Sequence, residues 1–194
     1  IPKACSPNDY ANNMSNVRRM PATIGALVVT VIIVLSAWAQ LTPNDKPEAW
    51  TFEIVATIPH DPDAFTQGLL VHDGLLFEST GKYGESTLRQ VELATGRVEK
   101  MISLSNYYFG EGITILGERL YQLTWRSNLT FIYDVDTLNR EETLRNEGEG
   151  WGLTHDGTHL IVSDGSASIR FHDPGTFDVV KRLDVTDDGR PVNS

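Results

Sequence analysis

A glycine-anchored pattern occurs three times in the sequence, and this repeat restricts the chain to very few folds. Gly68, Gly112 and Gly152 each begin a short apolar run that leads to another glycine and a second apolar run. The three glycines are 44 and 40 residues apart. A four-stranded unit that recurs at about this period is typical of a β-propeller blade. We therefore predict an all-β fold, a β-propeller with about three blades in this chain.

The rest of the chain after residue 40 agrees with this prediction, because short strand-like runs alternate with Gly-containing turns and no helical period is sustained. The expected strands are 68–71, 75–77, 88–93, 98–104, 113–116, 119–123, 129–135, 159–162, 168–172 and 177–185. Residues 52–58 also alternate, and they resemble the last strand of a unit rather than the first. This offset is expected when an N-terminal strand completes the final blade of a ring.

The first 39 residues have the pattern of a targeting segment. Arg18 and Arg19 precede an uncharged apolar run at 22–37, and Ala37-Trp38-Ala39 fits a signal-peptide cleavage site. This pattern predicts an exported protein, periplasmic or secreted, that is cleaved after Ala39. The alternative is a retained membrane anchor, although the apolar run is shorter than the roughly 20 residues that span a bilayer.

The predicted organisation is therefore a signal peptide or anchor at 1–39, a linker at 40–51 and a propeller domain at 52–194. Residues 40–194 carry 13 basic and 25 acidic side chains, a net charge of −12. Such a charge disfavours binding to nucleic acid and to an anionic membrane, so we expect membrane contact only through the N-terminal segment. It would attract a cation such as the protonated amino end of a peptide, or it serves solubility alone.

Metal and thiol chemistry are not indicated. The single cysteine, Cys5, precedes the folded part, which therefore has no disulfide and no thiol nucleophile. The five histidines are scattered and form no metal-binding pattern. We expect a domain without a metal or another cofactor.

The position before each anchoring glycine carries the candidate chemistry. The first strand of each propeller blade lines the central channel, so residues in equivalent positions should converge there. Gln67, Glu111 and Trp151 occupy this position in the three units. An amide, a carboxylate and an indole around one hollow would make a plausible site for a small polar ligand.

Three further aromatic residues are candidate walls of this pocket. Phe65 and Phe109 lie two residues before Gln67 and Glu111, and Trp125 follows the second strand of the middle unit. For each aromatic residue taken alone, packing between blades is the more common explanation. The pocket remains the alternative for the set as a whole.

Glu111 is the candidate proton-transfer group. It lies between two glycines and follows Tyr107, Tyr108 and Phe109, a setting that disfavours the ionised carboxylate. Glu78 is a second candidate acid, with a structural alternative as an acceptor of hydrogen bonds from neighbouring backbone and hydroxyl groups.

These segments, in this order and spacing, resemble the plant and bacterial type of glutaminyl-peptide cyclotransferase, also called glutamine cyclotransferase. The resemblance covers about residues 52–190. It rests on Phe65-Thr66-Gln67-Gly68-Leu69, Phe77-Glu78-Ser79-Thr80-Gly81, Tyr83-Gly84, Tyr108-Phe109-Gly110-Glu111-Gly112, Leu123-Thr124-Trp125, Gly150-Trp151-Gly152-Leu153 and Ser163-Asp164-Gly165.

The resemblance implies a five-bladed propeller and an acyltransferase that converts the N-terminal glutamine of a peptide or protein to pyroglutamate, with loss of ammonia and without zinc. Glu111 would match the family's proton-shuttling acid. The residues that would match the substrate pocket are Phe65, Gln67, Phe109, Trp125 and Trp151. Apart from the resemblance, we keep Glu78, the second candidate acid, as a supporting residue of this site.

The chain departs from the family in length, because only three units are present. It therefore resembles a partial member that lacks the later pocket residues. As it stands we expect an open ring with an exposed edge, prone to aggregation, and little or no activity on its own. We expect the folded protein to be a monomer.

Two other functions remain open from the sequence. The chain could be a non-catalytic propeller that presents its upper surface to a peptide or protein. A calcium-dependent lactonase is the other alternative, but it would need several Asp, Asn or Glu ligands in the channel. The convergent position holds Gln67, Glu111 and Trp151 instead.

Overall fold

The computed structural model describes residues 49–192. The predicted targeting segment at 1–39 and most of the linker at 40–51 lie outside the described residues. The chain divides into two units, Ile1–Glu53 and Ile54–Ser194. The described part of the first unit, residues 49–53, is exposed and has no regular secondary structure. Every strand described below belongs to the second unit.

The second unit is built from antiparallel sheets, and three of them have four strands each in sequence order. The first sheet contains β1 (Thr66–His72), β2 (Leu75–Thr80), β3 (Thr87–Glu92) and β4 (Val98–Ser103). The second contains β5 (Gly110–Leu116), β6 (Arg119–Thr124), β7 (Leu129–Asp134) and β8 (Arg140–Arg145). The third contains β9 (Leu153–His155), β10 (Leu160–Val162), β11 (Ser168–His172) and β12 (Val179–Asp184). A small hairpin of β13 (Thr186–Asp187) and β14 (Arg190–Pro191) follows.

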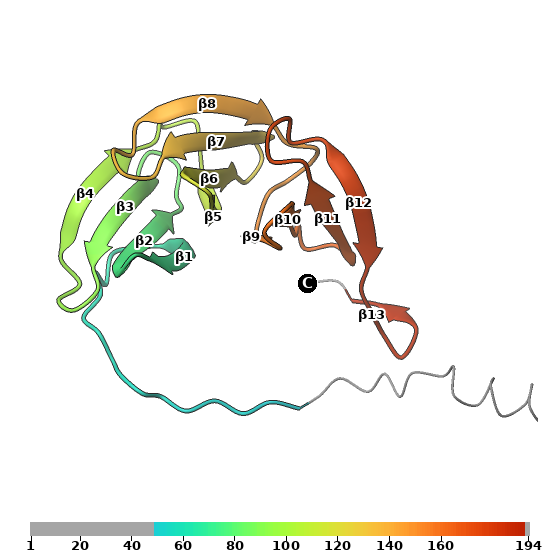
Figure 1. The fold of residues 1–194 in the computed structure, drawn as a ribbon, viewed down its shortest axis with the longest axis horizontal. Helices are drawn as coiled ribbons and strands as arrows, with labels where there is room; N and C mark the ends of the chain where they lie inside the picture. Colours follow the sequence, from blue (N-terminus) through green and yellow to red (C-terminus); the bar gives the residue numbers. More distant parts are fainter. Residues whose placement is uncertain (1–48, 193–194) are drawn as a thin grey trace, which may run out of the picture. The chain divides into compact units, whose positions relative to one another are not determined.

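The three four-stranded sheets are successive blades of a β-propeller, which we number blade 1 to blade 3. Within this unit they follow one another along an arc, with the first strand of each blade on the inner side (Figure 1). Strand β1 lies beside β5, and β5 lies beside β9. The predicted all-β propeller with about three blades is therefore confirmed.

The hydrophobic core lies between the blades. One face of blade 2 is buried against blade 1, and the other face is buried against blade 3. Successive side chains of a strand point to opposite faces of its sheet. In β6, Leu120 belongs to the cluster shared with blade 1, which includes Phe77 and Leu88. The next residue, Tyr121, belongs to the cluster shared with blade 3, which includes Leu160. Each apolar cluster thus joins two blades.

The anchoring glycines allow the inner strands to approach one another. A Cβ atom on Gly68 would lie 2.7 Å from the backbone nitrogen of Ile113 in blade 2. A Cβ atom on Gly112 would lie 2.5 Å from the carbonyl oxygen of Trp151, to which the Gly112 N–H donates a hydrogen bond of 2.8 Å. Any side chain at these positions would push neighbouring blades apart.

The structure differs from the expected strands at three places. Residues 52–58 form no strand, and Phe52 and Val55 are each 91% exposed, because no strand lies beside this segment in the described part of the chain. Strand β8 and the β13–β14 hairpin were not expected. The sequence of β8, Arg140–Arg145, is largely polar since it forms the exposed outer edge of blade 2.

Residues 49–192 contain no helix of the length and hydrophobicity needed to cross a membrane.

Candidate active site

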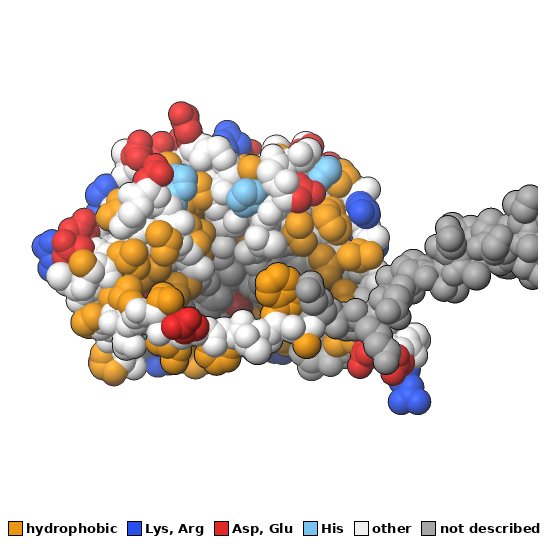
Figure 2. All heavy atoms as spheres, turned by 60° about the horizontal axis from the view of Figure 1, so that its bottom comes forward, with side chains coloured by type: hydrophobic (Ala, Val, Ile, Leu, Met, Phe, Trp, Pro, Cys, Tyr) orange, Lys and Arg blue, Asp and Glu red, His pale blue; other side chains and the backbone are white. Residues whose placement is uncertain are grey.

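A cavity of about 620 Å³ brings together the residues that the sequence places before the anchoring glycines. The concave side of the arc is hollowed, and hydrophobic side chains lie around the hollow (Figure 2). The cavity is lined by Phe65, Gln67, Lys82, Phe109, Glu111, Trp125 and Trp151. Six of these were candidate site residues from the sequence, and they come from all three blades.

Gln67 and Glu111 reach the cavity from irregularities in the inner strands. The pairing of β1 with β2 shifts register between Thr66 and Gly68, which leaves Gln67 in a bulge. The pairing of β5 with β6 shifts between Gly110 and Ile113, which places Glu111 in a bulge of the next blade. Bulges redirect side chains and are common beside active sites. A bulge in the inner strand therefore directs both the Gln67 amide and the Glu111 carboxylate into the cavity.

The surroundings of the Glu111 carboxyl group disfavour its ionised form and raise its pKa. The residue is 8% exposed, and no hydrogen bond to its carboxyl group is present among residues 49–192. Burial is the main cause that raises the pKa of Glu111 to about 7, and the negative charge of Glu149 raises it further. A carboxyl group with this pKa can both accept and return a proton at neutral pH.

The aromatic walls are arranged around Phe109. Its ring makes edge contacts with Phe65, Tyr83 and Trp125 at centroid distances of 6.2, 5.6 and 5.4 Å. Gly81 leaves room for this ring, because a Cβ atom there would lie 2.4 Å from it. Phe65 and Trp151 remain 49% and 38% exposed, so the cavity is open to solvent on one side.

Glu149 was not identified from the sequence, yet it connects two walls of the cavity. Its Oε2 atom accepts hydrogen bonds from the indole N–H groups of Trp125, at 2.8 Å, and Trp151, at 3.0 Å. Its Oε1 atom accepts one from Arg126 at 3.2 Å. The signal in the sequence is the Gly-Glu-Gly triplet at 148–150, which repeats the triplet around Glu111.

Lys82 was also missed, and among residues 49–192 it is the one cationic side chain that lines the cavity. It has a φ angle of 81°, and its Nζ atom lies 5.6 Å from the centre of the Phe65 ring. Two of the segments that carry the family resemblance flank it, ending at Gly81 and beginning at Tyr83, but the pattern assigns no role to Lys82 itself.

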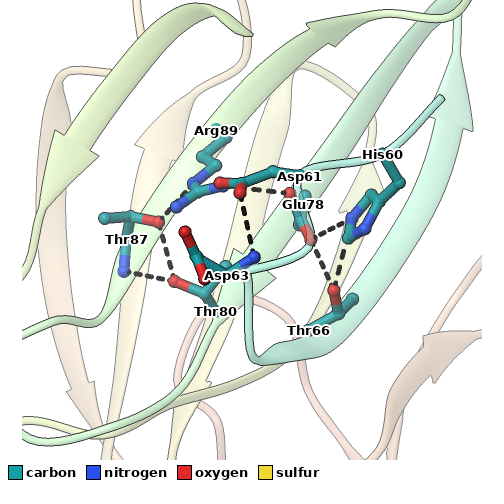
Figure 3. Close-up of polar contacts among 8 residues, drawn as sticks. All are labelled: His60, Asp61, Asp63, Thr66, Glu78, Thr80, Thr87 and Arg89. Atoms are coloured by element: carbon teal, nitrogen blue, oxygen red, sulfur yellow. Dashed lines mark hydrogen bonds and ion pairs between the residues drawn. The ribbon is translucent and has the colours of Figure 1, made fainter. Parts of the chain in front are cut away.

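Glu78 lies outside the cavity, in a separate polar network (Figure 3). The residue is 1% exposed, and its Oε1 atom accepts a hydrogen bond of 2.5 Å from Thr66 and lies 2.8 Å from His60 Nε2. Its other oxygen lies 3.7 Å from Arg89. These contacts give Glu78 a structural place in blade 1.

The same network holds the segment that leads into β1. Arg89 donates hydrogen bonds to Asp61 at 2.8 Å and to Thr87 at 2.8 Å, and Asp61 accepts one from the backbone of Asp63 at 3.0 Å (Figure 3). Residues 60–63 are thereby fixed to blade 1, directly before Phe65. The network therefore supports the cavity without contacting it.

The described residues, 49–192, contain no group of three or more His, Cys, Asp or Glu side chains arranged to hold a metal ion.

Comparisons with known proteins give one consistent family. A model of the family described as glutamine cyclotransferase matches residues 26–194. The chain is 48% identical over 142 residues to a glutaminyl-peptide cyclotransferase from Arabidopsis thaliana, a match that covers 72% of this chain and 44% of that protein. It is also similar to the crystal structure of Myxococcus xanthus glutaminyl cyclase, with a TM-score of 0.67 and 42% identity. This match covers 73% of the chain and 60% of that structure.

A more distant likeness concerns the fold alone. Kuenenia stuttgartiensis hydrazine synthase matches with a TM-score of 0.51 and 16% identity, over 70% of this chain and 40% of that one. The chain thus spans roughly half the length of its more similar relatives, 44% in one case and 60% in the other.

Proposed function

The chain belongs to the glutamine cyclotransferase family, and from this premise we propose that it cyclises the N-terminal glutamine of a peptide or protein to pyroglutamate and releases ammonia. The observation that carries the proposal is the position of Glu111, a carboxyl group with a pKa of about 7 in an aromatic cavity. Its partner would be a peptide or protein with an N-terminal glutamine, and no metal would be needed.

The reaction needs one proton acceptor that later acts as a donor. The α-amine of the substrate attacks the carbon of its own γ-amide, so a new C–N bond closes a five-membered ring. The attacking nitrogen then loses a proton to the Glu111 carboxylate. Glu111 returns this proton to the amide nitrogen as the old C–N bond breaks and ammonia leaves. The carboxylate is regenerated, so a single residue balances both transfers.

The remainder of the cavity would hold the glutamine side chain folded back on its amine. Holding the two reacting groups together lowers the entropic part of the barrier. The Gln67 amide offers a donor and an acceptor for the substrate amide. The rings of Phe65, Phe109, Trp125 and Trp151 would exclude water and limit the conformations of the side chain.

The test is the release of ammonia from a dipeptide with an N-terminal glutamine. Because the chain spans 60% of the Myxococcus xanthus protein, it is measured alone and joined to the C-terminal part of that protein. We expect Glu111→Gln to fold normally and to lower turnover by at least about 10²-fold, the range of a general acid–base contribution. Glu118→Gln is the control, since Glu118 is an exposed carboxylate at the turn after β5.

Two outcomes would contradict the proposal in different ways. Near-normal ammonia release from Glu111→Gln would remove this residue from the mechanism. Binding of the dipeptide without any release would favour the alternative function, a propeller that only binds the ends of peptides.

A further inference from the structure

Glu149 lies where two blades meet at the cavity. It belongs to the loop between β8 of blade 2 and β9 of blade 3. Trp125 follows the second strand of blade 2, and Trp151 precedes the first strand of blade 3. Both indole N–H groups donate to the same carboxylate oxygen, at 2.8 and 3.0 Å. One side chain therefore connects pocket walls that belong to different blades.

The backbone around Glu149 is itself fixed. Arg170 of β11 is 4% exposed and donates hydrogen bonds to the carbonyl oxygens of Glu147 and Glu149, the second at 2.8 Å. The N–H of Gly150 donates to the carbonyl oxygen of Trp125 at 3.2 Å. A Cβ atom on Gly150 would lie 3.0 Å from Leu123 and 3.1 Å from the carbonyl oxygen of Thr124. The loop is therefore a fitted part of the site.

The hydrogen bonds to Glu149 favour its ionised form. The bond from Trp151 is the main cause that lowers the pKa of Glu149, with further contributions from Trp125 and Arg126. Hydrogen bonds to a charged acceptor are about twice as strong as those between neutral groups. The planar guanidinium of Arg126 also lies 3.9 Å from the centre of the Trp125 ring. The carboxylate and the cation together restrict the indole.

We propose that Glu149 is a positioning residue for this site: its carboxylate joins the indoles of Trp125 and Trp151 and sets the spacing of these two walls around the substrate. This inference rests on the proposed cyclisation. The ring closes only when the glutamine side chain is held against its amine, and a displacement of about 1 Å can cost on the order of 10²-fold in rate. Glu149 fixes the two walls before the substrate arrives.

The first experiment measures the indole N–H groups by NMR in the full chain, without substrate. Glu149→Gln keeps the shape and removes the charge, whereas Glu149→Asp keeps the charge and shortens the side chain by one methylene group. We expect both changes to shift the Nε1–H signals of Trp125 and Trp151 and to increase their exchange with solvent. The signal of Trp50, which is 82% exposed, serves as an internal reference.

The matched control is Glu147→Gln. Glu147 lies two residues away on the same loop, and its carboxylate pairs with Arg182 at 2.9 Å instead of with an indole. This variant removes the same charge from the loop and should leave both indole signals unchanged. If the signals of Trp125 and Trp151 stay at their wild-type positions in both Glu149 variants, the proposed connection between the walls is wrong.

The second experiment follows the titration of Glu111 in the same variants. Among residues 49–192, the charged groups to consider are Glu149 from the β8–β9 loop, whose charge acts on Glu111, Lys82 from the loop after β2, which lines the same cavity, and Arg126, which pairs with Glu149. We expect the midpoint for Glu111 to fall in Glu149→Gln and to fall less in Glu149→Asp. Glu147→Gln should leave it unchanged. A general loss of stability would not separate the three variants in this way.

The third experiment separates this inference from the proposed function. In the ammonia assay, we expect kcat/KM to fall by about tenfold to a hundredfold in both Glu149 variants and to stay at the wild-type value in Glu147→Gln. No release from the wild type joined to the C-terminal part of the Myxococcus xanthus protein would contradict the proposed function, while the NMR measurements would still decide the connection. Shifted indole signals with unchanged release would overturn the positioning role.

Discussion

At the scale of single residues, Glu111 combines two features that rarely occur together in a structural carboxylate. It is almost fully buried, and no donor among residues 49–192 stabilises its charge. Burying a charged group without a partner is costly, so such positions are uncommon unless the group has a function. Glu78 shows the contrast, since it is even more deeply buried but accepts a hydrogen bond from Thr66, contacts His60 and pairs with Arg89.

The raised pKa of Glu111 predicts a dependence of stability on pH. The ordinary pKa of 4.5 is the value in the unfolded chain, and the folded value is about 7. The protonated form therefore favours folding: its contribution is complete below pH 4.5 and is lost as the pH rises through 7. We expect Glu111→Gln to remove this loss, worth about 1–3 kcal/mol after allowance for solvent at the cavity mouth.

Urea denaturation of the wild type and of Glu111→Gln at pH 5 and pH 8 measures this effect. The variant should gain in unfolding free energy relative to the wild type between the two values. An equal pH dependence in both proteins would show that Glu111 ionises in the folded chain as it does in water.

The sequence predicted the site residues that share one position of the repeat. It missed the site residues whose importance depends on contacts with side chains of another blade or on the conformation of a loop. Gln67, Glu111 and Trp151 could be found because they precede equivalent glycines. Glu149 could not be assigned a role in the same way, because the repeat does not show that two indoles from different blades reach its carboxylate. Lys82 reaches the cavity because of the conformation of its loop, in which it has a positive φ angle. The spacing of the sequence repeat does not indicate this conformation.

At the scale of strands, the glycines of the repeat keep the inner strands close enough to form the cavity. The spacing predicted these positions, and the structure gives the reason: Gly68 and Gly112 face the backbone of the next blade. Gly152 differs, because the nearest atom to a Cβ there is the side-chain oxygen of Ser163, at 2.7 Å. The Ser163 side chain can rotate away from an added methyl group at position 152. The hydrogen-bonded backbone beside Gly68 and Gly112 cannot move in this way.

This difference predicts unequal costs for three similar substitutions. We expect Gly68→Ala and Gly112→Ala each to lower the free energy of unfolding by about 1–3 kcal/mol, the usual cost of overpacking. Gly152→Ala should cost about 1 kcal/mol or less, the value of one altered hydrogen bond. Urea denaturation of the three variants gives the comparison. Equal costs at all three positions would mean that the backbone contacts between blades do not restrict the fold.

The strands that the sequence missed are those that gain little from burial. The inner and middle strands of blade 2 are buried along most of their length, because both faces of this blade are covered by a neighbouring blade. Strand β8, Arg140–Arg145, lies on the outer edge, and four of its six residues are exposed. Its sequence therefore lacks the apolar period on which such predictions depend. Residues 52–58 show the opposite case, a strand-like pattern for which the described structure contains no pairing partner.

At the scale of the whole molecule, the stability of the fold and the shape of the cavity both depend on the packing between neighbouring blades. Each apolar cluster lies between two blades. The cavity is lined from all three blades, so its shape depends on how the blades are spaced. Contacts that cross a boundary between blades, such as those of Gly112 and Glu149, therefore affect both. The sequence could predict the blades from their period, but it could not predict these contacts.

Under the proposed function, the net charge of residues 40–194, −12, predicts which peptides with an N-terminal glutamine would associate faster. A negative surface raises the local concentration of cations and speeds their association. The Debye length is about 30 Å at 0.01 M salt and about 8 Å at 0.15 M, so the effect should extend over the domain only at low salt. We compare two peptides that begin with glutamine and carry either Lys or Glu at the third position. Stopped-flow tryptophan fluorescence measures their association without requiring turnover.

We expect the Lys peptide to associate severalfold faster than the Glu peptide at low salt, and the ratio to approach one at physiological salt. Lys82, the cationic group of the cavity lining, acts against this preference only at short range. Lys82→Gln is the control. It should slightly increase the preference for the Lys peptide over the Glu peptide, and this preference should still decrease as the salt concentration rises. A faster association of the Glu peptide at low salt would show that this one lysine outweighs the field of the domain. A ratio that does not change with salt would show that contacts inside the cavity, rather than long-range attraction, decide which peptide binds.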